Sequence, residues 1–248
     1  MNAASSRSAS ILRIAAGAAS REEPDEVAVE EPLELRIEGR SVAVMMRTPG
    51  HDRELAAGFL LTENLIHRAA DIFEITACQS TDDDQVVNVT LRNPDAFDPA
   101  RLTRNIFSSS SCGVCSKATI EAVRLSYPPI DDDAKIAAPT LLKLPAALRS
   151  AQQTFERTGG LHACGLFDLA GNLEIAREDV GRHNALDKLI GHELLAERLP
   201  ARGRVLLLSG RVSFEMMQKA LAAGIAIVAA ISAPTSLAVE FAHANNQT

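Results

Sequence analysis

The feature that most constrains the fold is a pair of short apolar segments in the second half of the chain. Val205–Leu208 and Ile225–Ile231 contain no charged residue and show no alternation of apolar and polar positions. Strands of this kind are buried on both faces, as in a parallel or mixed sheet that helices cover. Each apolar segment is followed by a stretch with helical spacing, Phe214–Ala223 after the first and Ser236–Ala242 after the second. A further helical stretch, Asn184–Leu195, precedes both segments. The sequence therefore predicts an α/β fold for this half.

One helix and two further strands are expected before these elements. Leu161–Asp168 and Leu173–Ala176 have strand character around a turn that contains Gly171. A helix precedes them, because apolar residues recur there at intervals of three or four: Leu141, Leu144, Leu148, Ala151 and Phe155. This helix is expected to end at Gly159, which suits a left-handed cap.

The first half predicts a smaller α+β unit. Apolar and polar residues alternate over residues 27–37, and Ser41–Met46 is a second extended run, so the two are expected to pair as a hairpin. Asp52 is placed to cap a helix. Further strands are expected at Ile72–Ala77 and Val86–Leu91.

These patterns divide the chain into three regions. Residues 1–23 are rich in Ala, Ser and Arg, and Arg13 interrupts their apolar stretch, so a disordered leader is expected rather than an export signal. Residues 24–130 form the N-terminal subdomain, which ends in a Ser-rich loop with two cysteines and a helix. A linker rich in Pro and Asp then leads to the α/β domain at residues 136–244.

Composition argues against several classes of function. The formal charge is −7 and only 4% of the residues are aromatic, so nothing global favours a nucleic acid or an anionic membrane surface as partner. No apolar run approaches 18 residues, so no transmembrane helix is expected. Without an export signal, the four cysteines are expected in a reducing cytoplasm. There a close cysteine pair binds metal or reacts more often than it forms a structural disulfide.

The pair Cys112-Gly113-Val114-Cys115 is the first candidate site. It lies between a Ser-rich loop and an expected helix start, where backbone N–H groups and Lys117 would stabilise a thiolate. The spacing alone leaves four interpretations open: half of a zinc site, a redox dithiol, a persulfide carrier and a pair of incidental small residues. Zinc would need two more ligands, for which the candidates are Cys78, Cys164 and His162.

Three loops that follow strand-like runs form the second candidate site. Each offers small residues, hydroxyl groups and helix N-terminal N–H groups, and two carry an arginine. Ligands of open α/β sheets bind at the carboxyl ends of the strands, and helix N-termini there bind phosphate. We therefore expect a phosphate-bearing ligand at Arg182, His183, Asn184, Ser209, Gly210, Arg211, Ser213, Ser232, Thr235 and Ser236. The competing interpretation is ordinary helix capping and ion pairing, which uses the same residue types.

Other chemistry-bearing residues have a structural interpretation. His162 begins a strand, where a single histidine is more often structural than catalytic. Cys78 and Cys164 lie in apolar surroundings and are expected to be buried small side chains. Met216 and Met217 have helical spacing with apolar neighbours and are expected in the core.

Six segments together resemble the formate dehydrogenase accessory sulfurtransferases. They occur in the order of that family between about Val27 and Phe241, and as a set they are far more specific than the cysteine pair. The segments are Arg47–Gly50 with Leu55–Glu63, Ser110–Cys115, Thr158–Ala163, Asp179–Lys188, Ser209–Met216 and Ser232–Glu240.

The resemblance implies both an activity and a fold. Proteins of this kind take sulfur from a cysteine desulfurase as a cysteine-bound persulfide and pass it to the molybdenum or tungsten bis-guanine-dinucleotide cofactor of formate dehydrogenase. By this resemblance Cys112 carries the persulfide, Cys115 assists, and the three loops hold the guanine-nucleotide part of the cofactor. The resemblance also implies a cytidine-deaminase-like α/β sandwich with a mixed sheet, no tightly bound metal and a homodimer.

Two other functions stay open at this point. One is a non-catalytic chaperone that binds the cofactor or apo-formate dehydrogenase, and the other is a zinc-stabilised α/β binding module. The resemblance further implies a strand and a basic Gly-Arg stretch after the last helix, and residues 242–248 contain no such stretch. Weaker cofactor binding is the expectation that follows.

Overall fold

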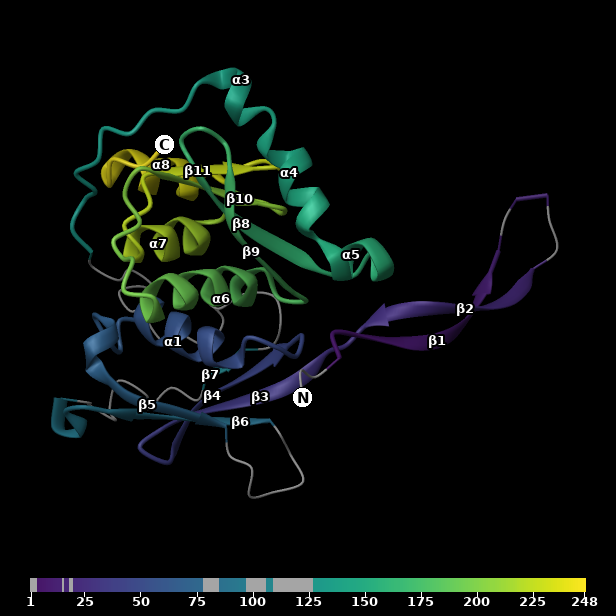
Figure 1. Cartoon of the computed structure of the whole chain (residues 1–248), viewed down its shortest axis with the longest axis horizontal. Coiled ribbons are helices and arrows are strands. Elements are labelled where there is room, and N and C mark those ends of the chain that lie inside the picture. The colour runs from purple at the N-terminus through teal and green to yellow at the C-terminus, as the bar shows by residue number, and fades with distance from the viewer. Residues whose placement is uncertain (1–3, 15, 18–19, 78–84, 97–105, 109–126) are drawn as a thin grey trace.

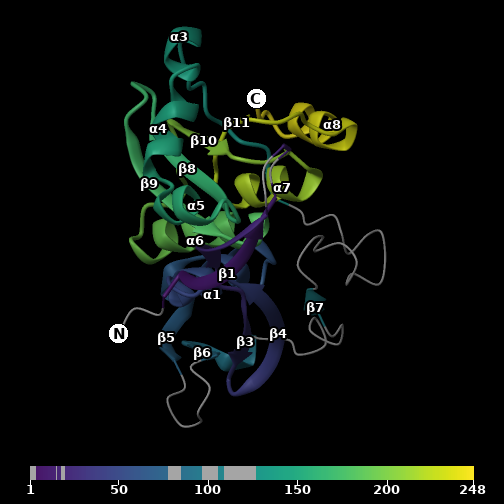
Figure 2. The ribbon, with the colours of Figure 1, turned by 90° about the vertical axis from the view of Figure 1, so that its right-hand side faces the viewer.

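The computed structural model describes residues 4–14, 16–17, 20–77, 85–96, 106–108 and 127–248. Over these residues the backbone forms three sheets, with helices packed between and around the two larger ones (Figure 1, Figure 2). None of the described helices is long and apolar enough to cross a membrane. The α/β class predicted from the sequence is confirmed, whereas the boundary between two domains stays a prediction.

The sheet of the second half is mixed, as predicted. Its strands are β8 (His162–Asp168), β9 (Leu173–Asp179), β10 (Arg204–Leu208) and β11 (Ile227–Ala230), in the order β11-β10-β8-β9. β10 is parallel to β11 and antiparallel to β8, which is antiparallel to β9. Leu206 and Leu208 of β10 enter one hydrophobic cluster, while Val205 and Leu207 enter another. Burial on both faces explains why β10 shows no polar alternation.

Helices bury the two faces of this sheet. α6 (Arg182–Leu195) packs against one face and α4 (Leu144–Ala151) against the other. α7 (Phe214–Ala222) and α8 (Ser236–Ala244) pack on each other, with the rings of Phe214 and Phe241 edge to face at 5.0 Å. Met216 and Met217 are buried, which confirms their predicted place in the core.

The sheet of the first half has the order β5-β6-β3-β4-β7. Its strands are β3 (Glu31–Ile37), β4 (Arg40–Arg47), β5 (Ile72–Ala77), β6 (Val86–Leu91) and β7 (Ile106–Ser108), accompanied by the 3-10 turns η1 (Ala69–Asp71) and η2 (Pro94–Ala96). The predicted hairpin of β3 and β4 is confirmed, and its turn places Glu38 and Gly39 at positive φ angles of 50° and 74°.

Two helix predictions need correction. The single helix expected from Leu141 to Phe155 is instead three short helices, α3 (Ala138–Leu141), α4 and α5 (Gln153–Thr158). The proline in the first turn of α4 explains the break after α3, because proline lacks an N–H and fits only at a helix start. The break between α4 and α5 lies at Gln152, whose ψ of 70° is not helical. Asp52 does not cap α1 (Asp52–Thr62), since its carboxylate pairs at 3.0 Å with buried Arg47. The left-handed cap at Gly159 is confirmed by its φ of 65°.

The structure also differs from the expected disordered leader over residues 1–23. β1 (Ser6–Arg13) and β2 (Arg21–Ala28) form an antiparallel hairpin, called the arm below, which extends from the body (Figure 1). Ion pairs connect the two strands, such as those of Arg13 with Glu23 and Asp25. Composition alone does not reveal such pairs, because it carries no information on the register of the strands. At the base, Arg157 of α5 pairs with Glu26 at 3.3 Å. The predicted Ser-rich loop with its two cysteines and the helix start expected after it lie outside the described residues.

Within the described residues, the two halves of the chain meet backbone to backbone where α1 crosses α6. A Cβ atom on Gly58 would lie 1.9 Å from the carbonyl oxygen of Asp187, and one on Gly191 would lie 1.8 Å from that of Glu54. The two backbones therefore touch, which only glycine at both positions allows. One continuous hydrophobic cluster extends across this crossing into both sheets.

We predict that Gly58→Ala destabilises the protein by about 3 kcal/mol or more, because the helices must separate to admit the methyl group. Chemical denaturation measures the change in unfolding free energy. Gly210→Ala is the matched control, since its Cβ would lie 3.5 Å from the nearest atom, an ordinary contact. A loss of stability no larger than that of the control would contradict the close crossing.

Candidate functional site

The three predicted loops gather at one end of the mixed sheet. β9, β10 and β11 run in the same direction, so their carboxyl ends share an edge with the start of β8 at His162. The loop after β10 joins the loop after β11, because the N–H of Thr235 donates to the carbonyl of Val212 at 3.0 Å. His183 at the start of α6 lies 2.9 Å from the Glu215 carboxylate at the start of α7. The predicted convergence of these loops is therefore present.

Part of the predicted set is engaged in holding the loops themselves. The amide nitrogen of Asn184 donates to the carbonyl of Met46 at 2.8 Å and to Asp179 at 3.0 Å. The Ser209 hydroxyl accepts from the N–H of Ala163 at 2.9 Å. Thr235 caps α8 by accepting from the N–H of Ala238 at 3.3 Å. All three residues are thus held by other parts of the protein, and Thr235 alone of them caps a helix.

Other predicted residues remain available to a ligand. Arg211, Ser232 and Ser236 are exposed. The hydroxyl oxygen of Ser213 is buried and has no hydrogen-bond partner among the described residues, although Ser213 occupies the N-cap position of α7. The first turns of α6 and α8 contain no acidic residue, which favours an anion there, although the carboxylates of Asp179 and Glu215 face the start of α6. The chemistry left at this end of the sheet suits a phosphate group.

His162, at the start of β8, lies beside two of the three loops. A Cβ atom on Gly210 would lie 3.5 Å from its Nδ1, so the loop after β10 passes beside the imidazole ring. Burial, together with the charges of Arg182 and His183, lowers the pKa of His162 below its usual value. A neutral ring at this position can accept or donate one hydrogen bond at each nitrogen without adding charge.

A buried ion pair that was not predicted from the sequence supports the first loop. The Lys188 ammonium lies 2.6 Å from the Asp179 carboxylate and donates to the carbonyl of Thr48 at 2.7 Å. Asp179 also accepts from the N–H groups of Thr48 and Gly181. Burial raises the pKa of Asp179, and the Lys188 charge opposes that rise. The sequence feature that could have indicated this pair is Lys188, which lies among apolar residues of the predicted helix Asn184–Leu195.

A second buried network lies at the other side of the helix crossing. Lys219 of α7 donates to the Asp187 carboxylate at 2.8 Å and to the Thr62 hydroxyl at 2.8 Å. Thr62 in turn donates to Asp187 at 2.8 Å, so all three groups are satisfied together. The network joins α1, α6 and α7. The thiol of Cys164 is buried nearby, which confirms the structural prediction for this cysteine, and burial raises its pKa.

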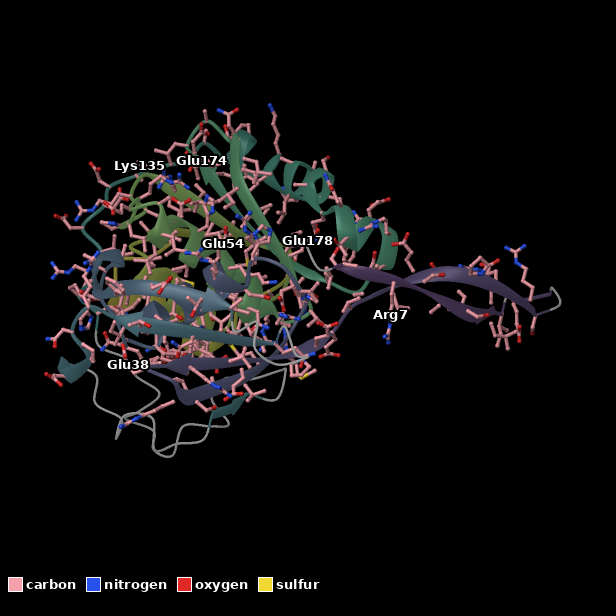
Figure 3. The ribbon with its side chains drawn as sticks, turned by 60° about the horizontal axis from the view of Figure 1, so that its bottom comes forward. Arg7, Glu38, Glu54, Lys135, Glu174 and Glu178 are labelled. Atoms are coloured by element: carbon pink, nitrogen blue, oxygen red, sulfur yellow. The ribbon has the colours of Figure 1, made fainter. Side chains whose placement is uncertain are left out.

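The outer ends of α1 and α6 meet in a surface cluster around Glu54, which Figure 3 labels. Arg177 donates to its carboxylate at 2.6 and 2.8 Å, and the ring nitrogens of His51 and His192 lie 3.3 and 3.0 Å away. Burial by itself raises the pKa of Glu54, but these hydrogen bonds outweigh burial and hold that pKa well below its usual range. The cluster fixes the carboxylate in its charged form.

The cysteine pair Cys112 and Cys115 lies outside the described residues, as does Cys78. Within the described residues, no group of three or more His, Cys, Asp or Glu side chains has the geometry of a metal site. The zinc interpretation of the pair is therefore not tested by the structure.

The fold and the site define an α/β protein with a mixed sheet. The three loops after β9, β10 and β11 lie together at one end of that sheet. A sequence profile described as the FdhD/NarQ family matches residues 28–248. The chain therefore belongs to the FdhD/NarQ family.

Named relatives and a solved structure agree with this membership. The "Sulfur carrier protein FdhD" of Mycolicibacterium paratuberculosis is 50% identical over 232 residues, which cover 91% of this chain and 85% of that protein. The protein of the same name from Sulfolobus acidocaldarius is 44% identical and covers 88% of this chain and 81% of its own length. The crystal structure of a formate dehydrogenase accessory protein from Desulfotalea psychrophila is 23% identical. Its TM-score is 0.76 over 99% of this chain and 91% of that chain, which shows a shared fold.

We predict that Lys188→Met lowers the unfolding free energy by about 3–5 kcal/mol, because it leaves the Asp179 carboxylate buried without its partner. The double variant Lys188→Met/Asp179→Asn should recover most of this loss, since no unpaired charge remains. Denaturant unfolding of the single variants and the double variant measures both effects. Additive losses in the double variant would show that the two side chains do not act as a pair.

Proposed function

We propose that this protein is a sulfur carrier that delivers sulfur to the molybdenum bis-guanine-dinucleotide cofactor, on which formate dehydrogenase activity depends. The observation that carries the proposal is the loop cluster at the carboxyl end of the sheet, in a chain whose relatives are named sulfur carrier proteins. A carrier of this kind needs a nucleophilic sulfur and a place to hold the cargo. The cysteine pair supplies the first and the loop cluster the second.

Sulfur loading is assigned to Cys112. Its thiolate attacks the outer sulfur of a persulfide on a cysteine desulfurase, the S–S bond of the donor breaks, and the donor cysteine leaves as a thiolate. Cys115 can then attack the outer sulfur on Cys112 in the same way, which moves the persulfide without any change of oxidation state. This chemistry suits the reducing cytoplasm, where both thiols stay free.

Cargo binding is assigned to the loop cluster. Arg182 and Arg211 supply positive charge, and the N-termini of α6 and α8, whose first turns contain no acidic residue, supply backbone N–H groups. Such groups bind the phosphates of a guanine dinucleotide in a chain whose net charge is −7. The buried hydroxyl of Ser213, which lacks a partner among the described residues, is a further donor toward that ligand. Two copies of the chain form the working unit.

Persulfide loading is the direct test. The protein is incubated with an active cysteine desulfurase and cysteine, and its intact mass is measured for the wild type, Cys112→Ala and Cys115→Ala. We expect a reducible gain of one sulfur in the wild type that Cys112→Ala abolishes, because Cys112 is the acceptor. Cys164→Ala serves as control, since Cys164 is buried and should not alter loading.

No gain of sulfur in any variant, with the desulfurase shown to be active, would overturn the carrier. That result would favour the alternative of a non-catalytic chaperone that binds the cofactor or apo-formate dehydrogenase.

A further inference from the structure

The arm has a free edge that a monomer leaves unused. β1 and β2 form a two-stranded sheet with no third strand among the described residues, and the arm extends well away from the body (Figure 1). A two-stranded hairpin is marginally stable by itself in water, and an unpaired strand edge is a template for another strand. The question is which of the two edges can accept one.

The hydrogen-bond pattern of the hairpin shows which residues of each strand point their N–H and carbonyl groups outward. The N–H of Val29 donates to the carbonyl of Ser5 at 3.0 Å, so the odd-numbered residues of β1 face β2 and the even-numbered residues face outward. Pro24 lies opposite Ser10 and therefore turns its nitrogen outward, where it removes a donor from the outer edge of β2. The same edge carries Glu22 and Glu26.

The outer edge of β1 has no such protection. Its outward residues are Ser6, Ser8, Ser10 and Leu12, all with an N–H and a carbonyl to offer. Proline and charge are the usual means of blocking a strand edge, and among the outward residues of the arm they occur only in β2. The arm is thus built so that one edge resists pairing and the other is open to it.

The arm also carries apolar surface at its tip and a cavity at its base. Leu12 is 58% exposed and Ile14 is 75% exposed. A cavity of about 500 Å³ lies at the base, between the arm, α5 and the loop before α1. Its lining includes Ala4, Ser5, Ser6, Thr48 and Thr154.

We propose that two copies of this chain pair through the outer edges of β1, antiparallel about a twofold axis at Ala9. In this register Ser6 lies opposite the partner subunit's Leu12, and Ser8 lies opposite the partner subunit's Ser10. The pairing uses all four outward residues of each strand, and the interface is self-complementary as a twofold dimer requires.

The positions of the charged residues and of the exposed tip both agree with this register. Arg7, which points away from the arm in Figure 3, lies opposite the partner subunit's Ile11, and Arg13 is already paired with Glu23 and Asp25. No like charges are placed directly opposite each other. Continued beyond the strand, the register brings the partner subunit's Ile14 to Ala4, which lines the cavity. The exposed tip of each arm is then covered by the other body.

This inference deepens the dimer included in the proposed function and is independent of its sulfur chemistry. A monomeric protein that still loads sulfur on Cys112 would refute the dimer alone, and a dimer that loads no sulfur would refute the carrier alone.

Proline substitutions at the two edges test the proposal. Ser8→Pro removes an outward N–H from β1, and Glu22→Pro removes one from β2 in the same hairpin. Sedimentation velocity over a concentration series should show that the wild type is a dimer. The dissociation constant of the dimer should rise about tenfold or more in Ser8→Pro and stay unchanged in Glu22→Pro. A monomeric wild type, or equal effects of the two variants, would overturn the proposal.

Cross-linking gives a second readout that does not depend on a disrupted arm. Ala9 faces its own copy across the axis as a non-hydrogen-bonded pair, whose Cα atoms lie about 4.5 Å apart, within disulfide range. Ala9→Cys should form an intermolecular disulfide on mild oxidation, located by peptide mapping, and Glu22→Cys should not. Failure of Ala9→Cys to cross-link in a folded dimer would overturn this register.

Discussion

The backbone contact of α1 with α6 is the constraint on which the rest of the structure depends. Gly58 and Gly191 let the two helices touch, and this contact joins the sheet of the first half to the sheet of the second. Two buried ion pairs flank it, Asp179 with Lys188 and Asp187 with Lys219. Buried charges are tolerated only when the geometry is good and further hydrogen bonds satisfy them. Thr48 and Thr62, both from the first half, supply those bonds.

The crossing thereby determines what the loop cluster can do. Lys188 and Asp179 fix the start of α6, and Asn184 fastens the same turn to the carbonyl of Met46. Residues engaged in this way are unavailable to a ligand but hold the neighbouring donors in place. The other groups, chiefly Arg211, the Ser213 hydroxyl and the helix N-termini, are left to meet a ligand. A rigid support under a few free polar groups is the arrangement that precise binding requires.

Much of this architecture could be predicted from the sequence because it depends on local patterns. The apolar runs of β10 and β11 indicated a doubly covered sheet, and the alternation in β3 indicated its hairpin with β4. The arm was missed because its register rests on cross-strand pairs, such as Ser8 with Glu26, that no single window shows. The helix crossing was missed for a similar reason, since Gly58 and Gly191 are more than a hundred residues apart and acquire their role only together.

The candidate site was likewise predictable only in part. The loops were predictable because hydroxyls, glycines and arginines after strands mark the carboxyl end of a sheet. Sequence could not separate the residues that hold the loops, such as Ser209 and Thr235, from those left for a ligand, because both sets are the same residue types. Lys188 was passed over because a lysine in a helix is ordinarily exposed, and its burial follows only from the contact with the first half.

The central claim is that sulfur loading and the loop cluster serve the same cargo. The most direct measurement follows radiolabelled sulfur from protein loaded by the desulfurase to added molybdenum bis-guanine-dinucleotide cofactor, for the wild type and for Arg182→Ala/Arg211→Ala. We expect both proteins to load sulfur equally, and transfer to the cofactor to be about tenfold or more slower from the variant than from the wild type. Equal transfer from both proteins, or none from the loaded wild type, would contradict it.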